Sequence, residues 1–400
     1  MRDTVYFTLP KKHEIIAIMK QKAIIFHPAI APYRIDFFNS LNELYEAEFY
    51  FEFENALEQS FQQQVLTERL HFVPRYLKKG AFGIKNLRLQ IISILLKSRP
   101  DVVICSEYNL STLLILLYKY LFQPSLRVYS ICDDSLGMVS HSGFVKRNSR
   151  KLSVRLLDGI ILANLAVRDW YWAHLKGGAR LLYFPIIQDD TQFRALLASS
   201  LPISQTLYRR LQLQGKRVLL FVGRLADVKN LHFLLKAFCQ LRSSFPDAVL
   251  LFVGEGAERE TLQAEAEAWE LTPCVHFAGK HEGVDLLAYY NLGQVFILPS
   301  YFEPFGAVVN EALLAGCYTL CSSAAGAACL IQAGENGELF DPHSLEDLVE
   351  KLRIALAKTE PLQGVSCKSN RMQHSYNYYF QSLSKELSAN KSDCRTLLGE

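Results

Sequence analysis

Two glutamates eight residues apart, Glu303 and Glu311, stand where a strand, a tight loop and a helix are predicted to meet. An apolar run at 295–298 predicts the strand, and an apolar pattern at 308–314 stopped by Gly316 predicts the helix. At helical rise the two carboxylates would lie on the order of 10 Å apart, the length of a sugar joined through a diphosphate to a ribose. N–H groups at the helix start would attract the phosphates. Two ordinary surface glutamates are the simpler alternative, but Glu311 lies among apolar residues.

Two cations five residues apart, Arg224 and Lys229, occur upstream at another predicted junction of a strand, a loop and a helix. The run RVLLFV at 217–222 predicts a strand, the loop GRLADVKN follows, and a helix is expected from near Leu231. Arginine as a planar fork and lysine as a point charge suit a diphosphate. A solvated loop with two common residues is the alternative, and the downstream glutamates favour the phosphate interpretation. The later Gly254-Glu255-Gly256 allows a close turn but is not a dinucleotide-binding fingerprint.

The first half offers candidate residues at two strand ends. The apolar strand at 22–26 is followed by HPAIAPYR, which supplies His27, Tyr33 and Arg34, and the strand at 127–131 is followed by Asp133, Asp134 and His141. Ligands of parallel α/β sheets bind beyond the carboxyl ends of the strands, so we expect these residues to face a ligand. Ordinary turn chemistry is the alternative for the adjacent aspartates. The basic stretch from Lys146 to Arg155 is interpreted as a solvated face.

Strands alternate with helical patterns through both halves, which predicts an α/β protein with parallel sheets covered on both faces. Further strands are expected at 48–53, 101–105, 159–163, 248–253, 275–278 and 318–321. We predict an N-terminal extension at 1–21, a first domain at 22–200, a second at 201–370, and a C-terminal helix with tail at 371–400. Residues 185–210 are predicted to be a polar connector, and Gly-rich turns are expected after 321. Met19 followed by KQKAIIFHP resembles a start, which leaves open whether residues 1–18 belong to the native protein.

The segment EPFGAVVNEAL resembles the Glu-x7-Glu motif of retaining GT-B glycosyltransferases of the family-four, or group 1, type. The resemblance is strongest from 217 to 348 and weaker in the N-terminal half. It implies two Rossmann-like domains facing across a cleft, with the C-terminal helix returning to the first domain. It also implies a nucleotide-sugar donor and no metal, because protein cations neutralise the leaving diphosphate.

The resemblance assigns roles residue by residue. Arg224 and Lys229 would bind the donor diphosphate, Glu303 the transferred sugar and Glu311 the ribose, with Asp133 as a catalytic candidate. The other donor-side candidates are Gly223, Lys280, Phe305, Gly306, Ala307 and Val308, and the acceptor-side candidates are Tyr33, Arg34, Asp134 and His141. Loop one lacks the family's frequent Gly-Gly pair, and Ala328 and Cys329 replace a frequent Pro-Glu. These departures bear on the donor sugar and acceptor.

Charge distribution, cysteine spacing and the length of apolar runs indicate where the protein is located in the cell and which partners it binds. Residues 1–190 hold 24 Lys and Arg against 18 Asp and Glu, a formal charge of +6, and the remainder carries −3. The segment 69–100 holds eight basic residues and no acidic one. It is interpreted either as a crossover helix with a solvated face or as a surface that meets anionic lipid. The nine cysteines lack a C-x-x-C spacing and are interpreted as buried reduced thiols. No apolar run reaches the ~18 residues of a spanning helix, so we expect a cytoplasmic protein, either free or peripheral on the inner face of the membrane, without nucleic-acid partners.

Together these patterns predict a retaining transferase that moves a hexose-type sugar to a hydroxyl of a glycan or lipid-linked acceptor. Cell-surface polysaccharide or lipopolysaccharide synthesis is the expected context. Two alternatives stay open: a nucleotide-sugar epimerase on the same fold, and a non-catalytic GT-B scaffold.

Overall fold

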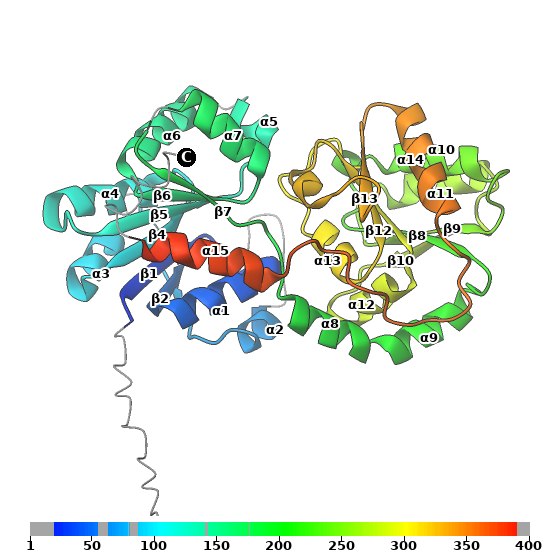
Figure 1. Cartoon of the computed structure of the whole chain (residues 1–400), viewed down its shortest axis with the longest axis horizontal. Coiled ribbons are helices and arrows are strands. Elements are labelled where there is room, and N and C mark those ends of the chain that lie inside the picture. Colours follow the sequence, from blue (N-terminus) through cyan, green and yellow to red (C-terminus); the bar gives the residue numbers. More distant parts are fainter. Residues whose placement is uncertain are drawn as a thin grey trace, which may run out of the picture.

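The computed structural model describes residues 20–54, 63–78, 80, 87–140, 143–175 and 177–389. It shows two parallel sheets side by side, each between layers of helices (Figure 1). Residues 1–19 of the extension predicted at 1–21, and the tail from 390, lie outside the described residues. Within the described part of the chain, no helix is both long and apolar enough to span a membrane.

The first sheet has seven strands in the order β3-β2-β1-β4-β5-β6-β7, all paired in parallel. Its strands are β1 (Lys22–His27), β2 (Glu46–Phe51), β3 (Arg75–Tyr76), β4 (Val102–Ser106), β5 (Arg127–Cys132), β6 (Gly159–Leu162) and β7 (Arg180–Tyr183). Strands β4, β5 and β6 are almost wholly buried, as expected for a sheet covered on both faces. The strand order reverses between β1 and β4, where such sheets bind ligands.

The helices of this unit are η1 (Pro32–Arg34), α1 (Ile35–Leu44), α2 (Gln63–Glu68), α3 (Gln90–Ser98), α4 (Leu110–Phe122), α5 (Leu136–Ser140), α6 (Phe144–Leu156) and α7 (Leu165–His174). Asn109 and Asn164 cap α4 and α7 by accepting hydrogen bonds from backbone N–H groups of the first turn. The expectation that the Lys146 to Arg155 stretch is wholly solvated is wrong, because Arg150 on α6 is only 1% exposed. Arg88, from the basic 69–100 stretch, is likewise buried and donates to backbone oxygens.

The second sheet has six parallel strands in the order β10-β9-β8-β11-β12-β13. Its strands are β8 (Arg217–Val222), β9 (Ala248–Val253), β10 (Val275–Gly279), β11 (Val295–Leu298), β12 (Tyr318–Ser322) and β13 (Gly337–Phe340). Its helices are η2 (Asp227–Lys229), α10 (Leu231–Leu241), α11 (Arg259–Ala268), α12 (Gly283–Leu292), α13 (Val308–Leu314), η3 (Gly326–Leu330) and α14 (Leu345–Ala357). The prediction of Gly-rich turns between 322 and 342 is wrong at β13, which pairs with β12.

The segment between the sheets is not the predicted polar connector. It forms two helices, α8 (Asp190–Ser199) and α9 (Leu201–Arg210), which pack on α12 beneath the second sheet (Figure 1). The side chains of Phe193, Leu197 and Leu207 are buried there. Pro202 stands in the first turn of α9, where a proline is tolerated because that N–H has no partner within the helix.

The final helix, α15 (Tyr376–Ser388), runs back across the first unit, as predicted (Figure 1). The hydroxyl of Tyr376 lies 2.8 Å from that of Ser40 on α1, and the ring of Phe380 packs edge-on against Phe37 at 6.4 Å. The aromatic stripe of the C-terminus therefore covers the core of the N-terminal unit. Among the described cysteines none forms a disulfide, and five of the eight are buried.

Candidate active site

The carboxyl ends of β8, β9 and β11 bring the predicted cations and glutamates together. The ammonium of Lys229 in η2 forms an ion pair with the carboxylate of Glu303 in the loop after β11. The two side chains are 15% and 13% exposed, so the pair is largely shielded from water and only weakly screened. Two loops 74 residues apart in sequence are thus joined at one point.

Arg224 lies in the same loop as Lys229 but faces solvent. It makes no ion pair within the described residues, so its guanidinium is available to an anion. Lys280, in the loop after β10, is also at the surface, and its ammonium pairs with the Glu282 carboxylate at 2.7 Å. The structure therefore gathers Arg224 and Lys229 around one loop and leaves Lys280 engaged at the surface.

Glycines set how closely these loops approach one another. Gly223 and Gly254, at the ends of β8 and β9, have φ of 153° and 152°. A Cβ on Gly254 would lie 1.8 Å from the carbonyl oxygen of Gly223. The turn at Gly254 therefore lies directly on the loop that carries Arg224. Gly306 has φ of 94°, and a Cβ there would meet Leu298 at 2.7 Å and Glu303 at 3.1 Å, so only glycine lets the backbone turn tightly behind Glu303.

The rest of the loop before α13 is largely enclosed. Phe305 is 4% exposed, while Ala307 and Val308 are half-buried. The carbonyl oxygen of Phe305 accepts a hydrogen bond from the Ala327 N–H at 2.7 Å. The loop is thus fixed against η3 and presents a defined backbone surface beside Glu303.

Glu311, in the first turn of α13, has both carboxylate oxygens bonded. The Gln188 amide donates to Oε1 at 2.8 Å, and the Tyr290 hydroxyl donates to Oε2 at 2.8 Å. Burial raises the pKa of this carboxyl, although both hydrogen bonds favour its charged form. Gln188 belongs to the crossing segment after β7, and its N–H also donates to Asn310 Oδ1 at 2.9 Å. The crossing segment is therefore anchored at the start of α13.

On the N-terminal side, the adjacent aspartates have different environments. The Asp133 carboxylate pairs with Arg34, which is buried, and remains about one-third exposed itself. Asp134 is buried, and its two oxygens accept from Lys146 at 2.9 Å and Arg150 at 2.8 Å. Asp134 therefore holds α6 against β5 and offers no unbonded oxygen to an acceptor. His141 lies outside the described residues.

Tyr33 connects the two sides. Its pKa is raised by burial, and the charges of Asp133 and of Glu303 add to this shift. Since Asp133 comes from the first unit and Glu303 from the second, charges from both units act on the Tyr33 hydroxyl.

Sequence patterns missed Glu107 at this edge of the first sheet. Glu107 follows β4 directly with φ of 57°, a conformation that non-glycine residues rarely adopt. Burial raises its pKa. A titratable residue directly after an apolar strand was the available signal. His27, a candidate from the sequence, ends β1, and burial together with the Arg34 charge lowers its pKa to about 4.

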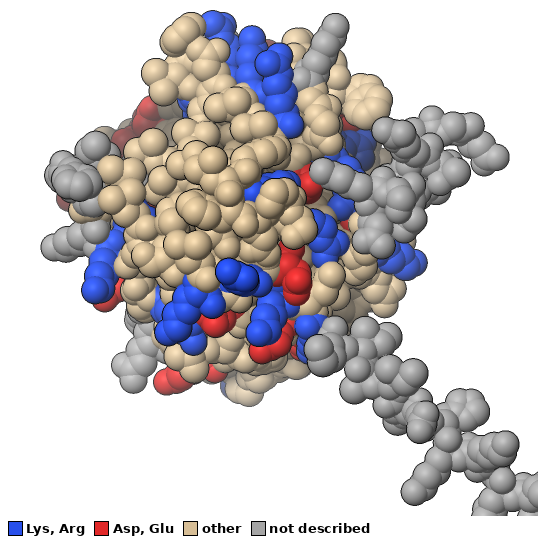
Figure 2. All heavy atoms as spheres, turned by 90° about the vertical axis from the view of Figure 1, so that its left-hand side faces the viewer, with Lys and Arg blue, Asp and Glu red and all other residues tan. Residues whose placement is uncertain are grey.

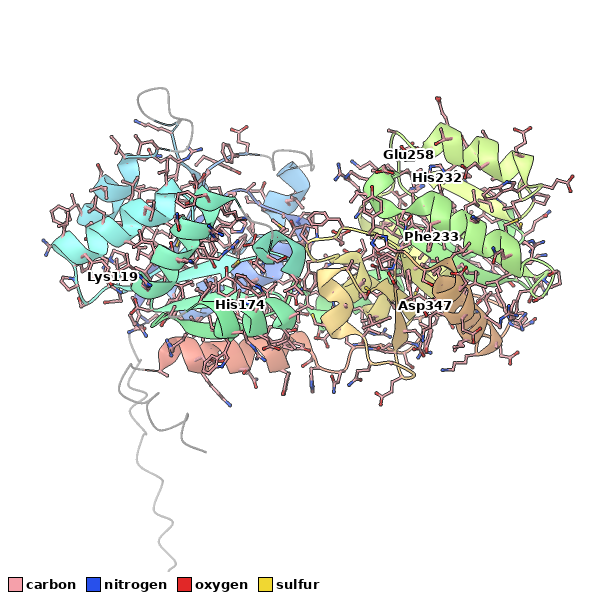
Figure 3. All side chains as sticks on the ribbon, turned by 90° about the horizontal axis from the view of Figure 1, so that it is seen from above. Lys119, His174, His232, Phe233, Glu258 and Asp347 are labelled. Carbon is pink, nitrogen blue, oxygen red and sulfur yellow. The ribbon has the colours of Figure 1, made fainter. Side chains whose placement is uncertain are left out.

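A histidine supports the donor-side loops from behind. Figure 3 shows His232 of α10 next to Glu258, which precedes α11. The ring nitrogens of His232 lie 2.8 Å from Glu258 Oε2 and 2.9 Å from Glu265 Oε2. These contacts tie the helix after the Lys229 loop to the helix after the Gly254 turn.

Comparison with known proteins places the second unit in a family. The model of the glycosyl transferases group 1 family matches residues 206–371. Glycogen synthase of Mycobacterium tuberculosis is 26% identical over 275 residues, 68% of this chain and 64% of that protein. The sulfoquinovosyl transferase of Arabidopsis thaliana is 34% identical over 148 residues, 36% of this chain and 28% of that protein. The alignments thus span less than two thirds of these relatives.

Solved structures match nearly the whole fold. HepE from Anabaena, in complex with UDP and glucose, superposes with a TM-score of 0.70 at 18% identity, covering 92% of this chain and 99% of that one. The lipopolysaccharide outer core galactosyltransferase WaaB gives 0.61 at 15% identity, covering 91% and 95%. The two-domain GT-B fold predicted from the sequence is confirmed. The unit that carries Arg224, Lys229, Glu303 and Glu311 is the part of the chain that matches the model of the glycosyl transferases group 1 family.

Proposed function

We propose that the chain is a retaining glycosyltransferase that moves a hexose-type sugar from a nucleotide-diphosphate sugar to a hydroxyl of a glycan or lipid-linked acceptor. The observation that carries the proposal is the shielded Lys229–Glu303 pair beside the exposed Arg224. Cations next to a carboxylate, at the carboxyl ends of parallel strands, suit a sugar diphosphate.

The comparisons support the donor class. HepE was solved with UDP, with UDP and glucose, and with UDP-glucose, and WaaB is described as a lipopolysaccharide galactosyltransferase. For this chain we propose a nucleotide-activated hexose and an acceptor from cell-surface polysaccharide or lipopolysaccharide synthesis. We place this activity in the cytoplasm, at or near the inner face of the membrane.

Each donor-side residue has a separate proposed role. Negative charge builds on the diphosphate as the bond to the anomeric carbon breaks, and Arg224 and Lys229 stabilise that charge without a metal ion. Glu303 accepts hydrogen bonds from the sugar hydroxyls, and Glu311 from the ribose hydroxyls. The backbone of Phe305, Gly306 and Ala307, with Val308 behind it, holds the sugar against Glu303.

The acceptor enters from the side of the first unit. Tyr33 lies near Asp133 and Glu303, so it can contact an acceptor sugar between them. Asp133 accepts a hydrogen bond from the acceptor hydroxyl and orients it. The hydroxyl oxygen bonds to the anomeric carbon on the face from which the diphosphate leaves, and the hydroxyl proton passes to the departing diphosphate. The Arg34 ion pair holds the Asp133 carboxylate in place. Closure of the two units excludes water that would hydrolyse the donor.

The first experiment is a thermal shift with UDP, GDP and ADP on the wild type and on Lys229→Ala. A ligand at 100 times its dissociation constant adds about 2.7 kcal/mol. We expect one nucleotide to raise the Tm of the wild type and to lose most of that effect in the variant. A wild type that responds to none of the three would contradict the proposed donor site.

Turnover then separates the reaction classes. With the nucleotide sugar identified, release of nucleoside diphosphate that depends on an added glycan acceptor supports a transferase. Conversion of the sugar to an isomer without acceptor indicates an epimerase. Nucleotide binding without either reaction indicates a scaffold.

A further inference from the structure

Helix α4 is apolar on the side that faces the core and on the opposite side as well. Thr112, Ile115 and Leu116 are buried against the sheet. Exposed residues recur at helical spacing on the other side: Leu110, Leu117, Tyr120, Leu121 and Phe122, which are 40–64% exposed. A helix that is apolar all round is normally covered all round. No element of the described chain covers this second stripe.

The neighbouring helices extend the stripe into a surface. The Tyr118 hydroxyl donates to the Leu95 carbonyl of α3 at 3.0 Å, and the Tyr120 hydroxyl to the Leu156 carbonyl of α6 at 3.3 Å, so α4 lies between α3 and α6. The outer face comprises the exposed residues Leu96, Leu117, Tyr120, Leu121, Phe122, Phe144, Val145 and Leu152. Figure 2 looks onto this end of the molecule and shows a broad area without charged side chains, bordered above by Lys and Arg and below by Lys and Arg interspersed with Asp and Glu.

The three helices that form the outer face carry charges of one sign. The sequences of α3, α4 and α6 contain no Asp or Glu. Their exposed cations are Lys97, Arg147, Lys151 and Arg155. Lys119 is the exception, because it is buried and pairs with Asp158. Apolar helices that carry exposed cations and no carboxylates of their own are complementary to an anionic, amphiphilic partner.

A hollow next to α6 has the same character. It has a volume of about 210 Å³ and is lined by Lys151, Arg155, His174 and Leu175. Lys151 and Arg155 are one helical turn apart on α6, and His174 ends α7 (Figure 3). Three basic side chains around a small hollow suit one phosphate group.

We propose that the outer face docks the protein onto an anionic lipid bilayer. The leucine, tyrosine and phenylalanine side chains enter the boundary between headgroups and acyl chains, and the cations meet lipid phosphates. The hollow between α6 and α7 takes one headgroup phosphate. Docking through α4 and α6 is a property of the N-terminal unit and does not depend on the proposed sugar transfer.

The test is co-sedimentation of the full chain with vesicles of phosphatidylcholine, with or without phosphatidylglycerol. We expect binding to the mixed vesicles, weak binding to phosphatidylcholine alone, and loss of binding at high salt. A basic residue near the surface contributes about 1 kcal/mol, so Lys151→Gln with Arg155→Gln should weaken partitioning roughly 25- to 30-fold. Leu117→Gln with Leu121→Gln should weaken it roughly tenfold or more.

Matched controls make the result decisive. Arg209→Gln with Lys236→Gln removes two exposed cations from the C-terminal unit and should leave partitioning unchanged. All variants alter exposed side chains, so their melting temperatures should match the wild type. Equal binding by all variants, or no binding by the wild type, would overturn the proposal. So would a dimer in light scattering that Leu117→Gln with Leu121→Gln dissociates, because the occupant would then be a second copy.

Discussion

Replacing Lys229 by alanine tests the role of the Lys229–Glu303 pair. The change removes a cation next to the position proposed for the leaving diphosphate. A single contact to charge that develops in the transition state is worth about 3–4 kcal/mol. We therefore expect kcat/KM to fall roughly 150- to 900-fold, measured as release of nucleoside diphosphate from the nucleotide sugar that the protein binds.

The same variant leaves Glu303 shielded and unpaired, since its side chain is only 13% exposed. Breaking such a pair from one side destabilises a protein, so the Tm should fall as well. The double variant Lys229→Ala with Glu303→Gln removes the unpaired charge and should recover part of the Tm. It should not recover activity, because the cation is still missing.

Two results would refute this reasoning. One is a kcat/KM of Lys229→Ala within threefold of the wild type. The other is recovery of activity in the double variant, which would mean that Lys229 only neutralises Glu303. Lys236→Ala, on the exposed side of α10, serves as the control for loss of one positive charge.

Three further predictions concern the framework of the site. Arg150→Met leaves Asp134 buried with one cation fewer and should lower the unfolding free energy by about 3–5 kcal/mol, measured by denaturant titration; an unchanged midpoint would contradict a structural role for the pair. Because the folded-state pKa of His27 is about 4, below the ordinary 6.5, its stabilising contribution is present above pH 6.5 and is lost as the pH falls to 4. It amounts to about 3 kcal/mol, so the pH dependence of denaturation between 7 and 4 should be shallower in His27→Gln. Gly254→Ala places a Cβ 1.8 Å from the Gly223 carbonyl oxygen and should abolish nucleotide binding in calorimetry, whereas Gly364→Ala, with nothing near its Cβ, should bind normally.

Three central strands of the second half were predicted accurately because they are locally encoded. The strands at 217–222, 248–253 and 295–298 are runs of apolar, largely branched residues bounded by glycine or proline, and the structure gives them the same limits. A continuous apolar run is what a parallel strand buried on both faces requires. The glutamates and cations next to those strand ends could therefore be placed at one edge.

The crossing segment shows where local encoding fails. Its acidic start and Pro202 are typical of a connector, yet Asp189 accepts from the Gln192 N–H at 2.9 Å as the N-cap of α8, and Pro202 lies in the first turn of α9. The same residues begin helices when α12 provides an apolar surface beneath them. Strand β13 was missed because four residues acquire their register only by pairing with β12.

The sequence by itself determined the chemistry that is available: two cations and two carboxylates next to strand ends. The tertiary structure decided which of these groups pair. Lys229 forms an ion pair with Glu303, and Glu311 accepts hydrogen bonds from Gln188 and Tyr290. Asp134 forms a buried ion pair with Arg150, whereas its neighbour Asp133 stays partly exposed. Periodicity fixes an element through neighbours three or four residues away, whereas these pairs join residues 16 to 123 positions apart. Their partners are set by the burial that packing imposes, because a charge removed from water must find a counter-charge or a hydrogen bond.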